Sequence, residues 1–394
     1  MLRKMIITMT VFVLAVFAGC ESHSQGKKAA KVAFDKSSAS IRLTVAQQQY
    51  SDGEYGQSLK TVRQCLETDP NNIGACLLYG KLLLANGQRE TAVDKLIYAL
   101  KLDDRLTEAW YWLGVAAQQE QKYSNAHLYY QQALLLDPTN VDYILSVAMA
   151  QVAQDKVEEA LTLLTEKMAA CPQEVSLKIA AADLMSRLGR YEQAQGLYKH
   201  SMLLTNDDSD VAQALGYCYM FDGKWNEAAE VFGALVEHSA DEQEKGRYLH
   251  VTALCSMNSA QYDKAIDYYN QLSSQQSDDA ELWLNLGQAA LGSGAVHRAL
   301  RCGQKAISLR TGYSDAIVLV GCAQYADSDY AAAVRTFERI SSDKKTGGFS
   351  WMMRARCYEK LGQRDEAERA YKKAFELNPN SKLANFLAKG RDNR

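Results

Sequence analysis

Apolar and small side chains in residues 107–140 fall into two helical stripes that are separated by a short polar turn. The first stripe is Trp110, Leu113, Gly114 and Ala117, and the second is Ala126, Tyr130 and Ala133. The spacing of i, i+3, i+4 and i+7 in the first stripe places its members on one face of a helix. Gly114 and Ala126 would let the two backbones approach closely, and Tyr130 would fill the space beside them. This segment is therefore predicted to fold as a helical hairpin.

The end of the hairpin is marked by residues 137–140, which read Asp-Pro-Thr-Asn. A residue that precedes proline is disfavoured in the helical region, so the second helix is expected to stop at Asp137. Thr139 and Asn140 suit a turn and the N-cap of a following helix. The chain is thus expected to start another hairpin after Asn140.

The same pattern recurs along most of the chain with a period of 34 residues. The repeats start at Ala39, Ile73, Thr107, Val141, Val175, Ser209, Gly246, Ala280, Ser314 and Gly348, with one three-residue insertion before Gly246. The twentieth residue is alanine in nine of these ten repeats, and all four prolines share one phase of the frame. A periodicity of this length indicates a stacked array of supersecondary units. Ten hairpins are therefore predicted.

This pattern resembles the tetratricopeptide repeat, which has the same period. The resemblance rests on two well-matched repeats: Trp110, Leu113, Gly114, Ala126, Tyr130, Ala133 and Pro138 in the third, and Trp351, Ala355, Tyr358, Ala367, Tyr371, Ala374 and Pro379 in the tenth. The fourth repeat departs from it with Lys167 at a small-residue position, and the eighth departs with Gly303 at the aromatic position. The resemblance implies an all-α, right-handed superhelical solenoid.

The frame also predicts how the chain is divided. Residues 39–242 would hold repeats 1–6 and residues 243–380 would hold repeats 7–10, with the insertion at residues 237–245 between them. Residues 381–394 would form a capping helix and a tail, since Ser381 can cap a helix whose Leu383, Phe386 and Leu387 cover the tenth hairpin.

The first twenty residues differ from the rest. Arg3 and Lys4 precede an apolar run at residues 5–18 that would span roughly 21 Å as a helix, less than the about 30 Å of a bilayer core. A basic start followed by a short apolar run is typical of a secretory signal peptide, here residues 1–19. Residues 17–20, Phe-Ala-Gly-Cys, resemble the bacterial lipobox, which implies lipidation of Cys20. Ordinary cleavage after Ala18 is the alternative.

A lipidated Cys20 would place the protein in the bacterial cell envelope. Glu21 follows the cysteine where an aspartate would favour the inner membrane of enteric bacteria, so we expect an outer-membrane lipoprotein that faces the periplasm. The polar residues 20–38 are expected to form a flexible tether between the lipid and the first repeat.

No residue pattern predicts catalysis, a cofactor, a metal site or a small-molecule substrate. The six histidines never pair at i and i+4, and the nine cysteines contain no CxxC pair. Ser341 and Lys344, with the Lys-Thr-Gly at residues 345–347, crowd into one predicted turn and are expected to be loop. Cys218, Cys255 and Cys357 share the tenth position of a repeat and are predicted to be buried free thiols. The net charge of -3 gives no basic excess for nucleic acid.

The family resemblance implies that positions 2, 5, 9, 12 and 13 of each first helix line a concave partner groove. The candidate groove residues are Leu77, Tyr111, Leu145, Met149, Ile179, Tyr217, Met220, Phe221, His250, Met257, Leu284, Val318 and Tyr325. A surface this apolar indicates a site for a protein or peptide segment with an apolar face. The alternative is that a tight superhelix buries part of the stripe against itself or against the tether.

The expected function is binding rather than catalysis. We expect a membrane-anchored periplasmic scaffold that holds protein partners during assembly of an envelope complex, such as a pilus, secretion or outer-membrane biogenesis machine. Two alternatives remain open, a regulator of a cell-wall enzyme and a structural lipoprotein that associates with itself.

Overall fold

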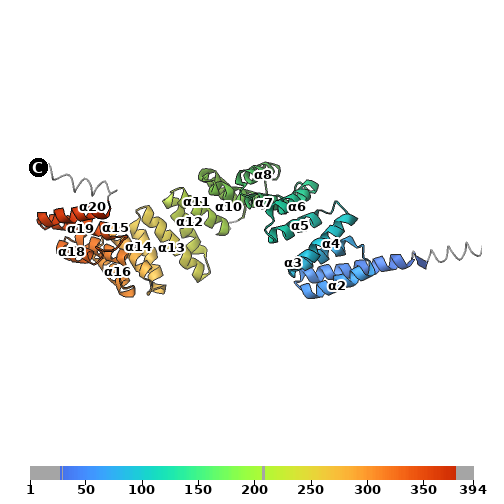
Figure 1. The fold of residues 1–394 in the computed structure, drawn as a ribbon, viewed down its shortest axis with the longest axis horizontal. Helices are drawn as coiled ribbons and strands as arrows, with labels where there is room; N and C mark the ends of the chain where they lie inside the picture. The colour runs from blue at the N-terminus through green and yellow to red at the C-terminus, as the bar shows by residue number, and fades with distance from the viewer. Residues whose placement is uncertain (1–26, 29, 206–208, 379–394) are drawn as a thin grey trace, which may run out of the picture. The chain divides into compact units, whose positions relative to one another are not determined.

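The computed structural model describes residues 27–378 except residue 29 and residues 206–208, and every regular element in these residues is a helix (Figure 1). Residues 30–51 are helical and precede the first labelled element. The elements are α2 (Tyr55–Thr68), α3 (Ile73–Ala85), α4 (Arg89–Leu102), α5 (Thr107–Gln119), α6 (Tyr123–Leu136), α7 (Val141–Val152), α8 (Val157–Ala170), α9 (Val175–Arg187), α10 (Tyr191–Thr205), α11 (Ser209–Phe221), α12 (Trp225–His238), α13 (Glu242–Asn258), α14 (Tyr262–Gln275), α15 (Ala280–Gly292), α16 (Val296–Leu309), α17 (Ser314–Ala326), α18 (Tyr330–Glu338), α19 (Gly347–Lys360) and α20 (Arg364–Leu377).

The helices confirm the predicted frame. Seven first helices begin on the predicted residue, namely α3, α5, α7, α9, α11, α15 and α17, and α19 begins one residue early. Most helices that follow one another in the sequence pack together, for example α5 on α6 and α15 on α16. The chain is an α-solenoid of helical hairpins, as expected.

One segment differs from the expectation. Residues 30–38, predicted to belong to the flexible tether, are helical and continue into the first helix of the first repeat. The insertion lengthens α13 to 17 residues, four more than α15. Asp241 caps this extension by accepting a hydrogen bond from the backbone N–H of Gln243 at 2.9 Å. The signal peptide, Cys20 and the capping helix at 381–394 lie outside the described residues.

The chain divides into two compact units, Met1–Leu184 and Met185–Arg394. The sequence placed a division at the insertion, but there α12 packs directly on α13. The observed division falls within α9, a helix that the repeat frame predicts without any interruption. The two units are described separately below.

Several hairpins are held by a glycine on the first helix that faces a large side chain on the second. A Cβ added to Gly216 would lie 2.6 Å from the Phe232 ring, and one added to Gly321 would lie 2.7 Å from the Phe337 ring. In the third repeat the ring of Tyr130 occupies the space in front of Gly114, as predicted. The small residue therefore sets how closely the two helices approach.

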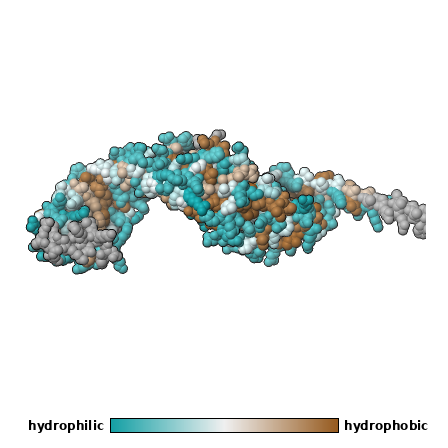
Figure 2. All heavy atoms as spheres, turned by 90° about the horizontal axis from the view of Figure 1, so that it is seen from above, coloured by the Kyte–Doolittle hydropathy of each residue, from teal (hydrophilic) through white to brown (hydrophobic). Residues whose placement is uncertain are grey.

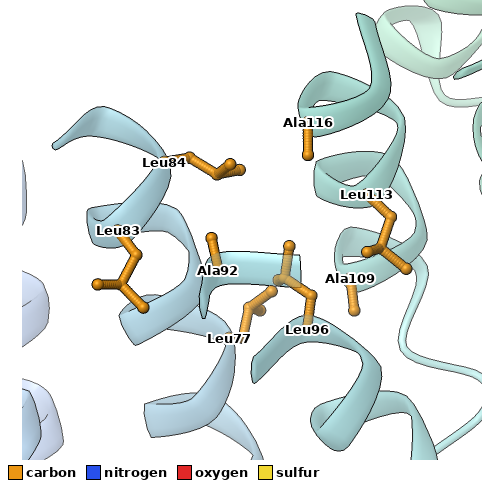
Figure 3. Packing of buried hydrophobic residues seen from close by; sticks show 8 residues of the cluster. All are labelled: Leu77, Leu83, Leu84, Ala92, Leu96, Ala109, Leu113 and Ala116. Atoms are coloured by element: carbon orange, nitrogen blue, oxygen red, sulfur yellow. The ribbon is translucent and has the colours of Figure 1, made fainter. Parts of the chain in front are cut away.

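Neighbouring hairpins share one core. Leu77 and Leu83 on α3, Leu96 on α4 and Leu113 on α5 belong to a cluster of buried side chains, each at most 9% exposed. Figure 3 shows Leu77, Leu96 and Ala109 of this cluster gathered between the three helices. Apolar burial between hairpins contributes roughly 25 cal/mol per Å², so each repeat is stabilised mainly by its neighbours.

The turn inside every hairpin needs a residue with positive φ at the fifteenth position of the repeat. Six of the ten are glycines, such as Gly223 at φ 76°. The other four are Gln121, Asp155, Ala260 and Ser328, with φ between 58° and 66°. A non-glycine residue in this region costs about 1–2 kcal/mol, so the packed hairpin imposes the conformation on these four residues.

Lys345 and Thr346 of the Lys-Thr-Gly segment lie in the turn between α18 and α19, as predicted, whereas Gly347 already begins α19. Asp343 organises the turn by accepting hydrogen bonds from the backbone N–H groups of Lys345 at 2.8 Å and Thr346 at 2.9 Å. The hydroxyl of Ser314 on α17 donates a third bond at 2.8 Å. These bonds lower the pKa of the Asp343 carboxyl to about 2, the bond from the Thr346 backbone being the largest cause.

We predict that Gly216→Ala destabilises the protein because the new methyl group collides with Phe232. Overpacking of this kind costs about 1–3 kcal/mol. Gly196 on α10 is the matched control, since a Cβ there would meet nothing within 4 Å. Gly196→Ala should stabilise the helix by about 0.5–1 kcal/mol. Urea unfolding followed by circular dichroism measures both, and equal midpoints for the two variants would contradict this account of the packing.

We predict that acid weakens the α18–α19 turn through Asp343. Its pKa is lowered from the ordinary value of 3.8 to about 2, so its stabilisation is complete above pH 3.8 and is lost as the pH falls toward 2. Asp343→Asn cannot titrate, so the gap in urea midpoint between the two proteins should shrink over this range. Asp104→Asn serves as the control. A constant gap between pH 4 and pH 2 would refute this role of Asp343.

Candidate partner groove

The predicted groove residues are not equally accessible. Leu77 is 9% exposed and Leu284 is 5% exposed, so neither can contact a partner in this conformation. Leu77 belongs to the core shared by α3, α4 and α5. The prediction that these two residues line an open groove is therefore wrong. In both places the close packing of the hairpins buries the inner position.

The most accessible part of the predicted groove lies on α11 and α13. We call it the 217–257 surface, and it consists of Tyr217, Met220, Phe221, His250, Leu254 and Met257. Phe221 is 69% exposed, Tyr217 is 39% exposed and Leu254 is 40% exposed. Both helices pack on α12, so they are neighbouring first helices of the array. Figure 2 shows apolar patches between polar residues on the face that it displays.

The helical register explains why these side chains point away from the core. Leu215, Gly216 and Cys218 are buried, while Tyr217 and Phe221 stand one turn apart on the other side of α11. On α13, His250, Leu254 and Met257 follow the spacing i, i+4 and i+7, which places them on one face. Each helix thus carries one stripe outside its buried face.

Ring contacts hold the two exposed aromatics in place. The Tyr217 ring meets the edge of the buried Phe232 ring with 5.1 Å between centroids. Phe221 stacks on Tyr191 of α10 at 6.4 Å. Aromatic pairs at these distances contribute about 0.5–1.5 kcal/mol beyond their burial. Tyr191 was not among the predicted groove residues.

The predicted residues of the first compact unit form a smaller surface. Met149 on α7 is 60% exposed and Leu145 is half-buried. Tyr111 is half-buried in an aromatic cluster, at 5.6 Å from Tyr130 and 5.3 Å from Tyr143. Only Met149 therefore offers a large exposed side chain here.

The remaining predicted residues lie largely in packed surroundings. Ile179 on α9 is half-buried. Val318 and Tyr325 on α17 pack against the core around Phe337, and the Tyr325 ring lies 5.3 Å from Tyr330. None of these three residues offers a large exposed side chain to a partner.

His127 and the three cysteines at the tenth position are in environments that favour their neutral forms. Burial lowers the pKa of His127, and the neighbouring Lys156 lowers it further. Cys218, Cys255 and Cys357 are buried and free, as predicted. Burial raises the pKa of the Cys255 and Cys357 thiols to about 11, so neither is an activated nucleophile. Among the described residues, no three His, Cys, Asp or Glu side chains are grouped as metal ligands.

No helix within the described part of the chain has both the length and the apolar character needed to cross a bilayer.

Comparison with known families identifies tetratricopeptide repeats in the chain. Two family profiles described as "Tetratricopeptide repeat" match residues 107–140 and 176–212. A profile described as "Cilia and flagella-associated protein 70 middle TPR-like domain" matches residues 249–378. The first match coincides with the third predicted repeat. The protein is thus an α-solenoid with tetratricopeptide repeats, a class that mediates protein–protein interactions.

Relatives and solved structures resemble the chain at low identity. The "BBSome complex member BBS4 homolog" of Drosophila melanogaster is 23% identical over 333 residues, which cover 83% of this chain and 62% of that protein. "Tetratricopeptide repeat protein 8" of Caenorhabditis elegans is 24% identical over 179 residues, covering 44% of this chain and 35% of the relative. The chain therefore spans between a third and two thirds of the length of these relatives. The structure of Pseudomonas aeruginosa pilF is 20% identical with a TM-score of 0.41, covering 53% of this chain and 94% of that one.

Proposed function

We propose that the protein is a scaffold that binds protein partners through the 217–257 surface. The observation that carries this proposal is the pair of aromatic residues Tyr217 and Phe221, which ring contacts hold while they remain 39% and 69% exposed. Aromatic side chains that are ordered before binding lose little conformational entropy in a complex. Tyrosine is also enriched at interface hot spots.

The apolar character of the surface indicates the kind of partner. Stripes on neighbouring first helices suit an amphipathic helix or an extended apolar segment laid across α11 and α13. The nearby Arg247 pairs with Glu244 at 3.2 Å, so its charge is partly compensated within α13. Affinity is therefore expected to come from apolar contact rather than from ion pairs.

The proposed location is the bacterial envelope, with the chain anchored through a lipid on Cys20. This part of the proposal is supported by the basic start, short apolar run and lipobox-like residues at 17–20. The two relatives described above are eukaryotic proteins, so the location depends on these first twenty residues alone. The scaffold would then act in assembly of an envelope complex.

We predict that a photocrosslinker at Tyr217 or Met257 captures a protein partner in cells, identified by mass spectrometry. Phe221→Asp should abolish capture from Met257 because it places a charge in an apolar contact. Leu135→Asp is the control, since Leu135 is 72% exposed on α6 and lies outside the surface. Capture that survives Phe221→Asp, or crosslinks only between copies of this chain, would refute the proposed surface.

We predict that the full chain incorporates labelled palmitate when it is expressed in a bacterial host, and that Cys20→Ala abolishes the label. A stable anchor needs more than one acyl chain, each methylene contributing about 0.8 kcal/mol. Cys171→Ala is the control and should label like the wild type. An unlabelled wild-type protein, with a mature N-terminus at residue 19, would establish ordinary cleavage after Ala18 instead.

A further inference from the structure

Two pockets among the described residues lie at equivalent places in the repeat frame. One lies between α4, α5 and α6 and has a volume of about 360 Å³, and the other lies between α14, α15 and α16 and has a volume of about 520 Å³. Each has a tryptophan from the fourth position of the first helix in its wall, Trp110 or Trp283. The indole N–H donates to a backbone carbonyl of the preceding turn in both, Asp104 at 3.0 Å and Ser277 at 2.8 Å. The same packing therefore builds both pockets.

The chemistry of the second pocket is different. Two positions on the preceding helix that are Ile97 and Leu100 in the first pocket are Asn270 and Ser273 in the second. At a third position, Cys302 replaces Tyr129, and the second pocket is the larger of the two. The second pocket is thus wider and more polar than the first, although both occupy the same place in the repeat frame.

Three cations line one wall of this second pocket, Arg298, Arg301 and Lys305 on α16. They occupy positions 19, 22 and 26 of the eighth repeat, which places them on one face of the helix. The third repeat has Asn125, Leu128 and Gln132 at these positions, and no other repeat has basic residues at all three. The basic wall is therefore a feature of one repeat and not of the array.

The charges of this wall are not balanced within the pocket. No carboxylate of the described residues forms an ion pair with any of the three side chains, and α16 contains no acidic residue. Arg298 donates a hydrogen bond to the side-chain oxygen of Asn270 on α14, which orients its guanidinium along the pocket wall. Like charges at i, i+3 and i+4 repel by about 0.2–0.5 kcal/mol per pair. An anionic ligand would relieve this repulsion.

We propose that the pocket between α14, α15 and α16 binds an acidic segment of a protein partner. Carboxylates of the segment contact Arg298, Arg301 and Lys305, and an apolar side chain between them packs against Trp283. Guanidinium groups suit carboxylates because they form paired hydrogen bonds. A protein is favoured over nucleic acid because the chain has a net charge of -3 and the basic wall holds only three cations.

This pocket is a second contact site, separate from the 217–257 surface. Its cations lie on the second helix of the eighth repeat, whereas the 217–257 surface lies on first helices of the sixth and seventh repeats. The inference goes beyond the proposed function and can fail independently of it. A scaffold with both sites would bind one partner by apolar contact and fix its orientation by charge.

The test uses the full mature chain and fluorescence anisotropy with a short fluorescein-labelled peptide of Glu and Asp around one Phe. The peptide should bind, and the double variant Arg301→Glu, Lys305→Glu should weaken binding by about ten-fold, as two reversed surface charges would. Raising NaCl from about 50 mM to about 300 mM should also weaken binding, because salt screens charges at this distance. A neutral variant, Arg301→Gln with Lys305→Gln, should give a smaller loss in the same direction.

The matched control introduces two glutamates at the equivalent positions of the first pocket, the one between α4, α5 and α6. Leu128→Glu with Gln132→Glu should leave peptide affinity unchanged, and so should Phe221→Asp in the 217–257 surface. Equal binding of the peptide's Gln/Asn counterpart, or undiminished binding by the charge-reversed variant, would overturn the proposal. Complete displacement by about 10 mM inorganic phosphate would indicate a small-anion site, and tighter binding of single-stranded DNA would indicate nucleic acid; either result also overturns it.

Discussion

The approach of two helices across a small residue is the constraint on which the rest of the structure depends. Where Gly216 faces Phe232, or Gly321 faces Phe337, a single methyl group would force the helices apart. Because hairpins within one compact unit pack on their neighbours, a change of spacing in one hairpin would be passed to the hairpins beside it. The alanine at the twentieth position and the aromatic residue at the twenty-fourth belong to the same contact. This contact explains why the pattern in the sequence is so regular.

Close packing also decides which side chains remain available for function. The buried faces of α11 and α12 fix Phe232, and Phe232 in turn supports the exposed ring of Tyr217. Elsewhere the same packing removes candidate residues from the surface, as it does with Leu77. The proposed binding surface therefore lies on helices whose large side chains stand beyond the reach of the neighbouring hairpin.

The sequence predicted the fold well because the repeated contact leaves a mark at fixed positions, and seven first helices start where the frame places them. The sequence predicted the starts of two helices less well, the first helix of the first repeat and α13. Residues 30–38 are helical because a helix can continue into solvent without apolar periodicity, and the insertion lengthened α13 because Asp241 caps it. The repeat frame predicted which side chains of a first helix face inward. It did not predict how deeply they are buried, because burial depends on the neighbouring helix, and the prediction for Leu284 was wrong for this reason. The basic wall at Arg298 occupies positions that the repeat does not constrain, and it is visible only when the repeats are compared with one another.

The positive φ of the hairpin turns has a consequence for how such an array diverges. All ten fifteenth positions adopt this backbone conformation, whether or not the residue is glycine. The geometry of the turn therefore belongs to the hairpin and not to the residue that occupies it. Glycine can be exchanged at these sites, as at Ala260, for a modest loss of stability and without a shift of register. Copies of one ancestral hairpin could accordingly drift apart in sequence at their turns while their helices stayed in step.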